Sequence, residues 1–170
     1  VLYTHRTLTE NSRVFANGLG VTSADRSVLC HCMASNFMFS QLTIPFLDVG
    51  GSIHIVDFGG AQQTLQAIID GASFLSLVPW FGCQLIETAR ARAPLPNRIR
   101  VAEVGGDRVP LSYFCEFEKV FGLTPREHLG MTEVNTFTSN PLLEGDLRLG
   151  SVGKALPEVE IEIRDPARHI

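Results

Sequence analysis

The stretch SFLSLVPWFGCQLIETARAR, residues 73–92, places a strand pattern directly before a helix pattern. Residues 73–78 form a short apolar run of the kind that a buried strand shows. Residues 79–92 follow a helical pattern, and Pro79 suits the first turn of a helix because no N–H is needed there. A strand followed at once by a helix is the unit of a parallel sheet, so this stretch predicts an α/β fold.

The same alternation extends along most of the chain. Further strands are predicted at residues 27–33, 52–58 and 98–104, and further helices at 7–20, 39–51, 61–71 and 109–122. We interpret residues 134–157 as a long polar loop, and residues 158–165 alternate acidic and apolar side chains as a half-exposed strand does. The prediction is a mostly parallel sheet flanked by helices, with a β-rich extension at its C-terminal end.

The composition is that of a globular protein. Hydrophobic residues make up 45% of the 170 residues and charged residues 19%, which argues against a disordered chain. The net charge of −4 and the pI of about 5.7 argue against a partner that is a nucleic acid. No apolar stretch is long enough for a transmembrane segment, and the first residues, VLYTHR, lack the pattern of a secretory signal.

The four cysteines fit neither a disulfide framework nor a zinc site. Cys30, His31 and Cys32 have the side chains of metal ligands, but a tetrahedral site needs four ligands that converge. The simpler interpretation places them in the buried strand 27–33. Reduced thiols suggest a cytoplasmic protein.

Two loops contain candidate functional residues. In EVGGDRVP, residues 103–110, Gly105 and Gly106 follow a predicted strand, where parallel sheets bind ligands. A tight turn is the alternative, because the spacing of a dinucleotide fingerprint is missing. In GMTE, residues 130–133, the Thr132 hydroxyl could meet a phosphate oxygen, and the Glu133 carboxylate is a ligand type that Mg²⁺ takes beside phosphates. A capped turn with a solvated carboxylate is the alternative there.

The order of the motifs resembles the adenylate-forming superfamily, which includes acyl-CoA synthetases, firefly luciferase and peptide-synthetase adenylation domains. The resemblance runs from YTHR through GGDRVP to GMTE and GSVGKALP, residues 150–157, and the last two motifs are its most specific parts. It implies a ligase with ATP, Mg²⁺ and coenzyme A as cosubstrates. A carboxylic acid would react with ATP to give an acyl-adenylate, and a thiol, usually that of coenzyme A, would then take the acyl group.

The resemblance also implies a role for each matching residue. Thr132 and Glu133 would be the catalytic residues, with Thr132 on a phosphate and Glu133 on the Mg²⁺. Glycines and Asp107 would lie along adenine and ribose, and the segment before Thr132 would form the opposite wall of the pocket. The nucleotide-binding residues implied in this way are Gly105, Gly106, Asp107, Leu129, Gly130, Met131 and Thr132.

The implied acid pocket contains Asn36, Phe37 and Trp80. No Asp or Glu occurs in residues 33–40, so an α-amino acid would bury its ammonium group unpaired, which is costly. The apolar side chains favour a fatty or aryl acid, as in fatty acid metabolism. Leu129 stands where the superfamily usually has an aromatic residue that stacks on adenine.

By the same resemblance, the chain is the central part of a large AMP-binding domain. Residues of about 21–135 would form an α/β subdomain, and residues 136–170 a loop and the start of the following β region. The phosphate loop expected before YTHR and the C-terminal domain with its catalytic lysine are absent from the sequence. We therefore expect this fragment to need these parts of the same protein as partners, and to be inactive alone.

Two alternatives remain open. A binding module of the same fold could hold a nucleotide or an acyl group without catalysis. An unrelated doubly wound domain, such as an oxidoreductase, is disfavoured because the dinucleotide fingerprint is missing.

Overall fold

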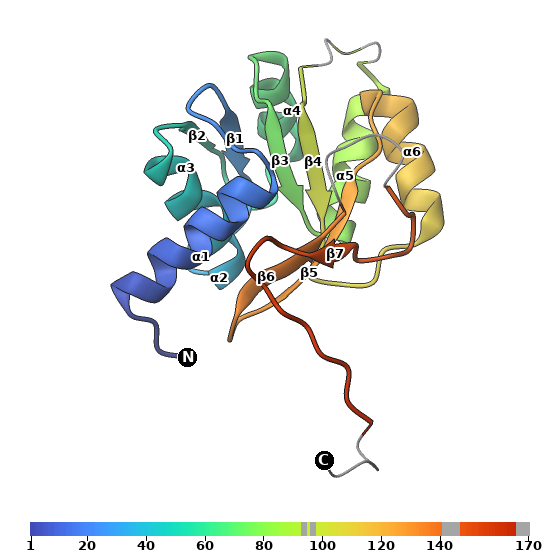
Figure 1. Cartoon of the computed structure of the whole chain (residues 1–170). Helices are drawn as coiled ribbons and strands as arrows, with labels where there is room; N and C mark the ends of the chain where they lie inside the picture. The colour runs from blue at the N-terminus through green and yellow to red at the C-terminus, as the bar shows by residue number, and fades with distance from the viewer. Residues whose placement is uncertain (93–94, 96–97, 141–146, 166–170) are drawn as a thin grey trace.

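Strands lie side by side in the order β2-β1-β3-β4-β5-β6-β7 in one sheet (Figure 1). The computed structural model describes residues 1–92, 95, 98–140 and 147–165. Strands β1 to β5 are parallel, whereas β6 and β7 pair antiparallel with their neighbours. The bounds are β1 Arg26–Leu29, β2 Ser52–Ile55, β3 Phe74–Leu77, β4 Val101–Val104, β5 Arg126–Met131, β6 Asn135–Ser139 and β7 Lys154–Ala155.

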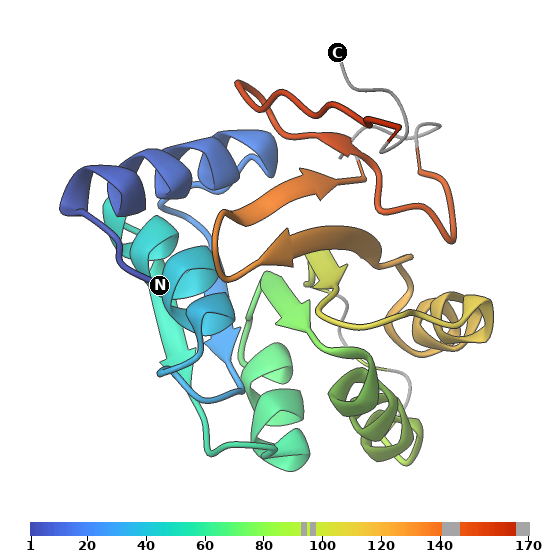
Figure 2. The same cartoon turned by 90° about the horizontal axis from the view of Figure 1, so that it is seen from below.

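Helices cover both faces of the parallel strands, as Figure 2 shows. Helices α4 Ala61–Ile69, α5 Pro79–Arg90 and α6 Leu111–Phe121 pack on one face, and α1 His5–Gly18 and α3 Ile44–Asp48 on the other. Strand β3 supplies both apolar cores because its side chains alternate: Leu75 and Leu77 face the first group of helices and Phe74 the second. The predicted fold class is confirmed.

The predicted helix 39–51 is wrong as one continuous helix. The chain forms a short helix, α2 Asn36–Met38, then a π-helical segment, η1 Phe39–Thr43, and then α3. Pro45 is the physical reason, since a proline inside an α-helix lacks an N–H and clashes with the carbonyl four residues before it. The π turn lets the N–H of Ile44 bond the carbonyl of Phe39, and Pro45 falls in the first turn of α3.

Three other predicted elements differ from the structure. Strand β1 ends at Leu29, so Cys30, His31 and Cys32 lie beyond it. Strands β6 and β7 lie within residues 134–157, where we predicted only a loop. The sequence of β6 is mostly polar and was therefore assigned to the loop, although its Asn, Thr and Ser residues are buried in the structure. Residues 158–165 form no strand, because the described chain offers them no strand to pair with.

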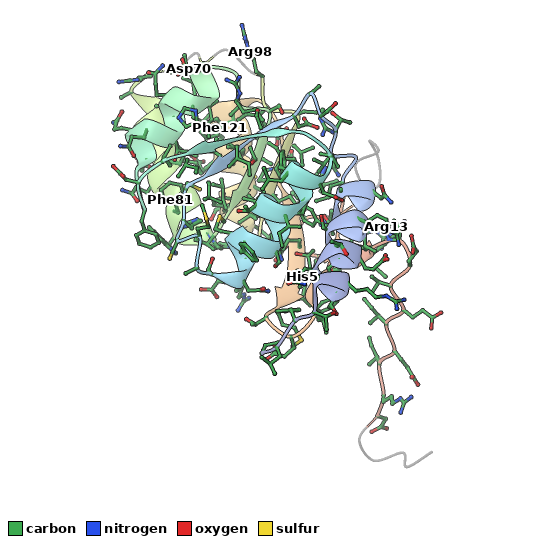
Figure 3. All side chains as sticks on the ribbon, turned by 90° about the vertical axis from the view of Figure 1, so that its left-hand side faces the viewer. His5, Arg13, Asp70, Phe81, Arg98 and Phe121 are labelled. Carbon is green, nitrogen blue, oxygen red and sulfur yellow. The ribbon has the colours of Figure 1, made fainter. Side chains whose placement is uncertain are left out.

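The C-terminal segment runs away from the sheet (Figure 1). Its start is tied to α1: Arg13 points toward it (Figure 3), and both guanidinium NH groups donate to the Glu158 carboxylate, at 2.9 and 2.8 Å. Further along, Ile163 is 95% exposed. Among the helices of the described residues, none has the length and apolar character to cross a membrane.

Asp25 anchors the loop before β1 and gives a prediction for stability. Arg100 donates to both carboxylate oxygens, at 3.0 and 2.6 Å, and Ser73 and Thr22 donate as well. Burial alone would raise the pKa of Asp25, but these hydrogen bonds lower it to about 2. The unfolded chain takes up this proton at higher pH than the folded chain, so stability present above about pH 4 should be lost as pH falls toward 2.

Asp25→Asn should therefore remove this part of the acid dependence and lower the free energy of unfolding at pH 7 by about 2 kcal/mol. Urea unfolding between pH 2 and pH 7 measures both effects. The exposed Asp48→Asn on α3 is the matched control. Equal acid profiles for Asp25→Asn and the unmodified chain would contradict the anchoring role.

Candidate functional site

A cleft of about 220 Å³ opens at the edge of the sheet where the parallel strands β4 and β5 end. The segment around α2 forms one wall, and the end of β5 with the following turn forms the other. The cleft brings together many of the residues singled out in the sequence. Its lining consists of Ser35, Asn36, Phe37, Gln41, Gly106, His128, Gly130, Met131 and Thr132.

Other predicted site residues lie outside this lining. Gly105 is buried behind it, Asp107 and Leu129 are exposed beside it, and Glu133 is exposed next to Thr132. Trp80 is exposed and lies apart from them at the start of α5, in an aromatic cluster with the exposed Phe58 and the half-buried His31. The structure therefore gathers the GMTE turn and the Asn36 wall, and it does not bring Trp80 to them.

The turn between β5 and β6 presents Thr132 and Glu133 at its tip. The N–H of Val134 donates to the carbonyl of Met131 at 3.2 Å and closes the turn, and both tip side chains are exposed. A Cβ on Gly130 would come within 2.8 Å of the Asn135 carbonyl oxygen. The close approach of β5 and β6 thus requires Gly130, and this reason is independent of the nucleotide-binding role that the resemblance implies for it.

Asn135 holds this turn against the opposite wall. Its Oδ1 accepts from Nδ2 of Asn36 at 2.7 Å and lies 3.5 Å from the Tyr3 hydroxyl. Ser40 Oγ lies 2.7 Å from the same oxygen and 2.6 Å from the Asn36 carbonyl, and its one hydrogen serves one of them at a time. Asn135 is buried and has a φ of 60°, a left-handed conformation that asparagine tolerates better than most residues.

Asn135→Gly should loosen the turn, because glycine keeps the backbone conformation and removes the acceptor. We expect faster amide hydrogen exchange at residues 132–134 and a loss of about 1 kcal/mol of stability. Asn135→Asp keeps Oδ1 and should retain most of the protection. Equal exchange rates in Asn135→Gly and the unmodified chain would show that the side chain does not hold the turn.

Behind the cleft lies a buried pair, Glu103 in β4 and His128 in β5. Ser139 Oγ donates to Glu103 Oε1 at 3.1 Å, His128 Nδ1 lies 3.9 Å from that oxygen, and the imidazole stacks on Phe37 with ring centroids 5.5 Å apart. Burial raises the pKa of Glu103 to about 8, although Ser139 and the charge of Arg126 lower it, and burial lowers the pKa of His128 to about 4. Both shifts favour the uncharged form of the group, and the 3.9 Å between the two atoms is too long for a hydrogen bond.

Sequence reasoning missed His128, Glu103, Gln41 and Asn135. Signals existed for two of them, because Glu103 interrupts an apolar strand pattern and Gln41 an apolar helix pattern. Asn135 had none, since its partner Asn36 lies 99 residues away in the chain.

Residues 1–169 match the family described as AMP-binding enzyme. The chain belongs to this family. The probable CoA ligase CCL8 of Humulus lupulus is 24% identical over 182 residues, covering 96% of this chain and 30% of the relative. The mitochondrial malonate–CoA ligase ACSF3 of Mus musculus is 39% identical over 72 residues, covering 42% of this chain and 12% of the relative.

Solved structures of AMP-binding enzymes have the same fold. ATP-bound MatB from Rhodopseudomonas palustris is 26% identical, with a TM-score of 0.81 over 91% of this chain and 30% of that one. The resemblance to adenylate-forming enzymes is thereby confirmed. The chain spans 30% or less of the length of each of these three relatives.

The side chains at the turn suit a nucleotide that brings its own Mg²⁺ better than they suit a metal site in which the protein supplies all the ligands. Among the described residues, no three His, Cys, Asp or Glu side chains are grouped as metal ligands. Glu133, by contrast, is a single exposed carboxylate beside a hydroxyl, and Mg²⁺ typically takes one or two carboxylates together with substrate phosphates.

Proposed function

We propose that the full-length protein is an ATP-dependent acid–CoA ligase that forms an acyl-adenylate and then a thioester. The observation that carries the proposal is the shared cleft, in which the wall with Asn36 and Phe37 faces the strand end with Thr132. An acid bound against the first wall would hold its carboxylate near the turn. The family and the CoA ligases among the relatives support this reaction.

In the proposed first step, a carboxylate oxygen of the acid attacks the α-phosphorus of ATP, the bond to the bridging oxygen breaks, and pyrophosphate leaves. The Thr132 hydroxyl donates to a phosphate oxygen on which charge builds up. Glu133 would hold the Mg²⁺ that neutralises the phosphates. In the second step, the thiolate of coenzyme A attacks the acyl carbon and AMP leaves.

The nucleotide would lie along the loop after β4. Gly106 lines the cleft, and Gly105 and Asp107 flank it, so adenine and ribose would rest there. Met131 and Leu129 would cover the other side. ATP-bound MatB, which has the same fold, supports the binding of a nucleotide by this fold.

The acid would be a fatty or aryl acid. Phe37 and Met131 support this class, since both offer apolar surface in the cleft, and Phe37 also stacks on His128. Three of the four free thiols, those of Cys32, Cys83 and Cys115, are exposed, and this supports a reducing, cytoplasmic location.

A non-catalytic binding module is the second candidate. Leu129, 43% exposed, favours it, because a leucine gives adenine no aromatic stacking partner. Such a module would bind ATP and an acid without breaking a phosphate bond.

Exchange of labelled pyrophosphate into ATP by the full-length protein tests the proposal. We expect exchange that depends on an added aryl or fatty acid and on Mg²⁺ and that needs no coenzyme A, because adenylation is the reversible first step. Nucleotide binding without exchange, for every acid tested, would overturn the ligase reaction in favour of the binding module.

A further inference from the structure

We propose that His128 is a positioning residue that holds the loop after β4 in place for the nucleotide. The inference rests on the proposed function, because residues 105–107 of this loop are those proposed to carry adenine and ribose. It starts from a close contact between the His128 imidazole, in β5, and Gly105, the first residue after β4.

The imidazole leaves no room for a side chain at Gly105. The φ of Gly105 lies outside the left-handed region, so its backbone conformation alone does not require glycine. A Cβ there would overlap the ring, with Cδ2 at 2.6 Å and Cε1 at 2.7 Å, and the three nearest atoms all belong to His128. The ring therefore lies directly against the Gly105 backbone, and this contact requires the glycine.

The imidazole is itself held in one orientation. His128 is 3% exposed, and its ring stacks on that of Phe37 with centroids 5.5 Å apart and an angle of 18° between the planes. At the edge of the ring, Nδ1 lies 3.9 Å from Oε1 of the buried Glu103. A side chain whose orientation is fixed by packing can hold a neighbouring segment in a defined position.

The loop needs such a support because it is exposed beyond Gly105. The Gly105 N–H donates to the carbonyl of Leu77, at the end of β3, at 3.1 Å. Residues 106–108 are exposed, and the Arg108 N–H donates to Asp107 Oδ1 at 2.7 Å, a bond within the loop itself. The contacts at Gly105 therefore fix the start of the loop, and a loop that is fixed beforehand loses less freedom when a ligand binds.

Binding of ATP to the full-length protein, measured by calorimetry with Mg²⁺, tests the inference. Gly105→Ala should weaken binding by about tenfold, because the added methyl group pushes the loop and the imidazole apart. His128→Ala should weaken it to a similar degree, since the loop loses its support. The double variant should bind ATP about threefold or more tightly than Gly105→Ala alone, because the methyl group then occupies room that the imidazole has left.

Gly18→Ala in α1 is the matched control. Gly18 also has a φ outside the left-handed region, and an added Cβ would lie 2.8 Å from Cδ2 of the Leu156 side chain. This variant should lower the thermal unfolding temperature and leave the affinity for ATP unchanged, which separates a loss of stability from a loss of loop position. His128→Asn, which also shortens the side chain, replaces His128→Ala if that variant does not fold.

Pyrophosphate exchange by the same variants distinguishes this inference from the ligase proposal. Both single variants should raise KM for ATP more than they lower kcat. Equal affinity for ATP in Gly105→Ala and the unmodified protein, or additive losses in the double variant, would overturn the inference even where exchange proceeds. The expected rescue of ATP binding without any exchange would support the inference and count against the ligase. No ATP binding by the unmodified protein would overturn both.

Discussion

Glu133→Gln should lower acid-dependent pyrophosphate exchange of the full-length protein by more than about tenfold, because glutamine keeps the shape of the side chain and removes the charge that Mg²⁺ needs. Glu133 is exposed at the tip of the turn between β5 and β6, so the substitution should leave thermal unfolding unchanged. The loss should appear as weaker use of Mg²⁺-ATP and should shrink when Mg²⁺ is raised.

Glu118→Gln on the exposed face of α6 is the matched control for this experiment, since it removes the same charge far along the chain from the turn. A similar decrease in both variants would indicate a general effect of net charge. Near-normal turnover of Glu133→Gln would rule out the metal role of this carboxylate.

Gly153→Ala should have the largest effect on stability, a loss of about 3 kcal/mol. Gly153 has a φ of 84°, a conformation that strains residues with a Cβ, and an added Cβ would overlap the main chain at Ser139 and Asn140. The neighbouring residue, Lys154, pairs with Ser139 in the β6–β7 ladder, so the clash should separate these strands. Urea unfolding of the chain measures the loss.

Gly59→Ala separates backbone strain from steric overlap, because Gly59 has a similar φ of 72° and no atom near the added Cβ. We expect a loss of about 1 kcal/mol from backbone strain alone. Equal losses in the two variants would contradict the predicted overlap with β6.

The parallel part of the fold could be predicted because its signals are local. Short apolar runs before helical patterns identified β1 to β4, and Pro79 marked the start of α5. The antiparallel part could not be predicted in the same way. β6 consists mostly of polar residues whose burial depends on neighbouring strands, and residues 158–165 have a strand pattern without a partner in the described chain. Whether a segment forms a strand depends on a second segment with which it can pair, and a local sequence pattern describes only the first.

The candidate site was predictable where a motif marked it. Thr132 and Gly106 line the cleft and belong to motifs, whereas Gln41 and His128 belong to none. Their position depends on the π turn before Pro45 and on the contact of β5 with the Phe37 ring, which no spacing in the sequence encodes. The residues proposed to hold ATP and Mg²⁺, and Asn36 and Phe37 of the acid pocket, thus came from sequence, whereas the buried Gln41 and His128 came from structure.

The nucleotide product shows most directly whether the full-length protein is an AMP-forming acid–CoA ligase. The full-length protein would be incubated with ATP, Mg²⁺, coenzyme A and each of a set of aryl and fatty acids in turn, and the products separated by chromatography. We expect AMP and acyl-CoA in equal amounts with at least one acid, and neither product when the acid is omitted. ADP as the product, or AMP formed at the same rate without the acid, would contradict the ligase proposal.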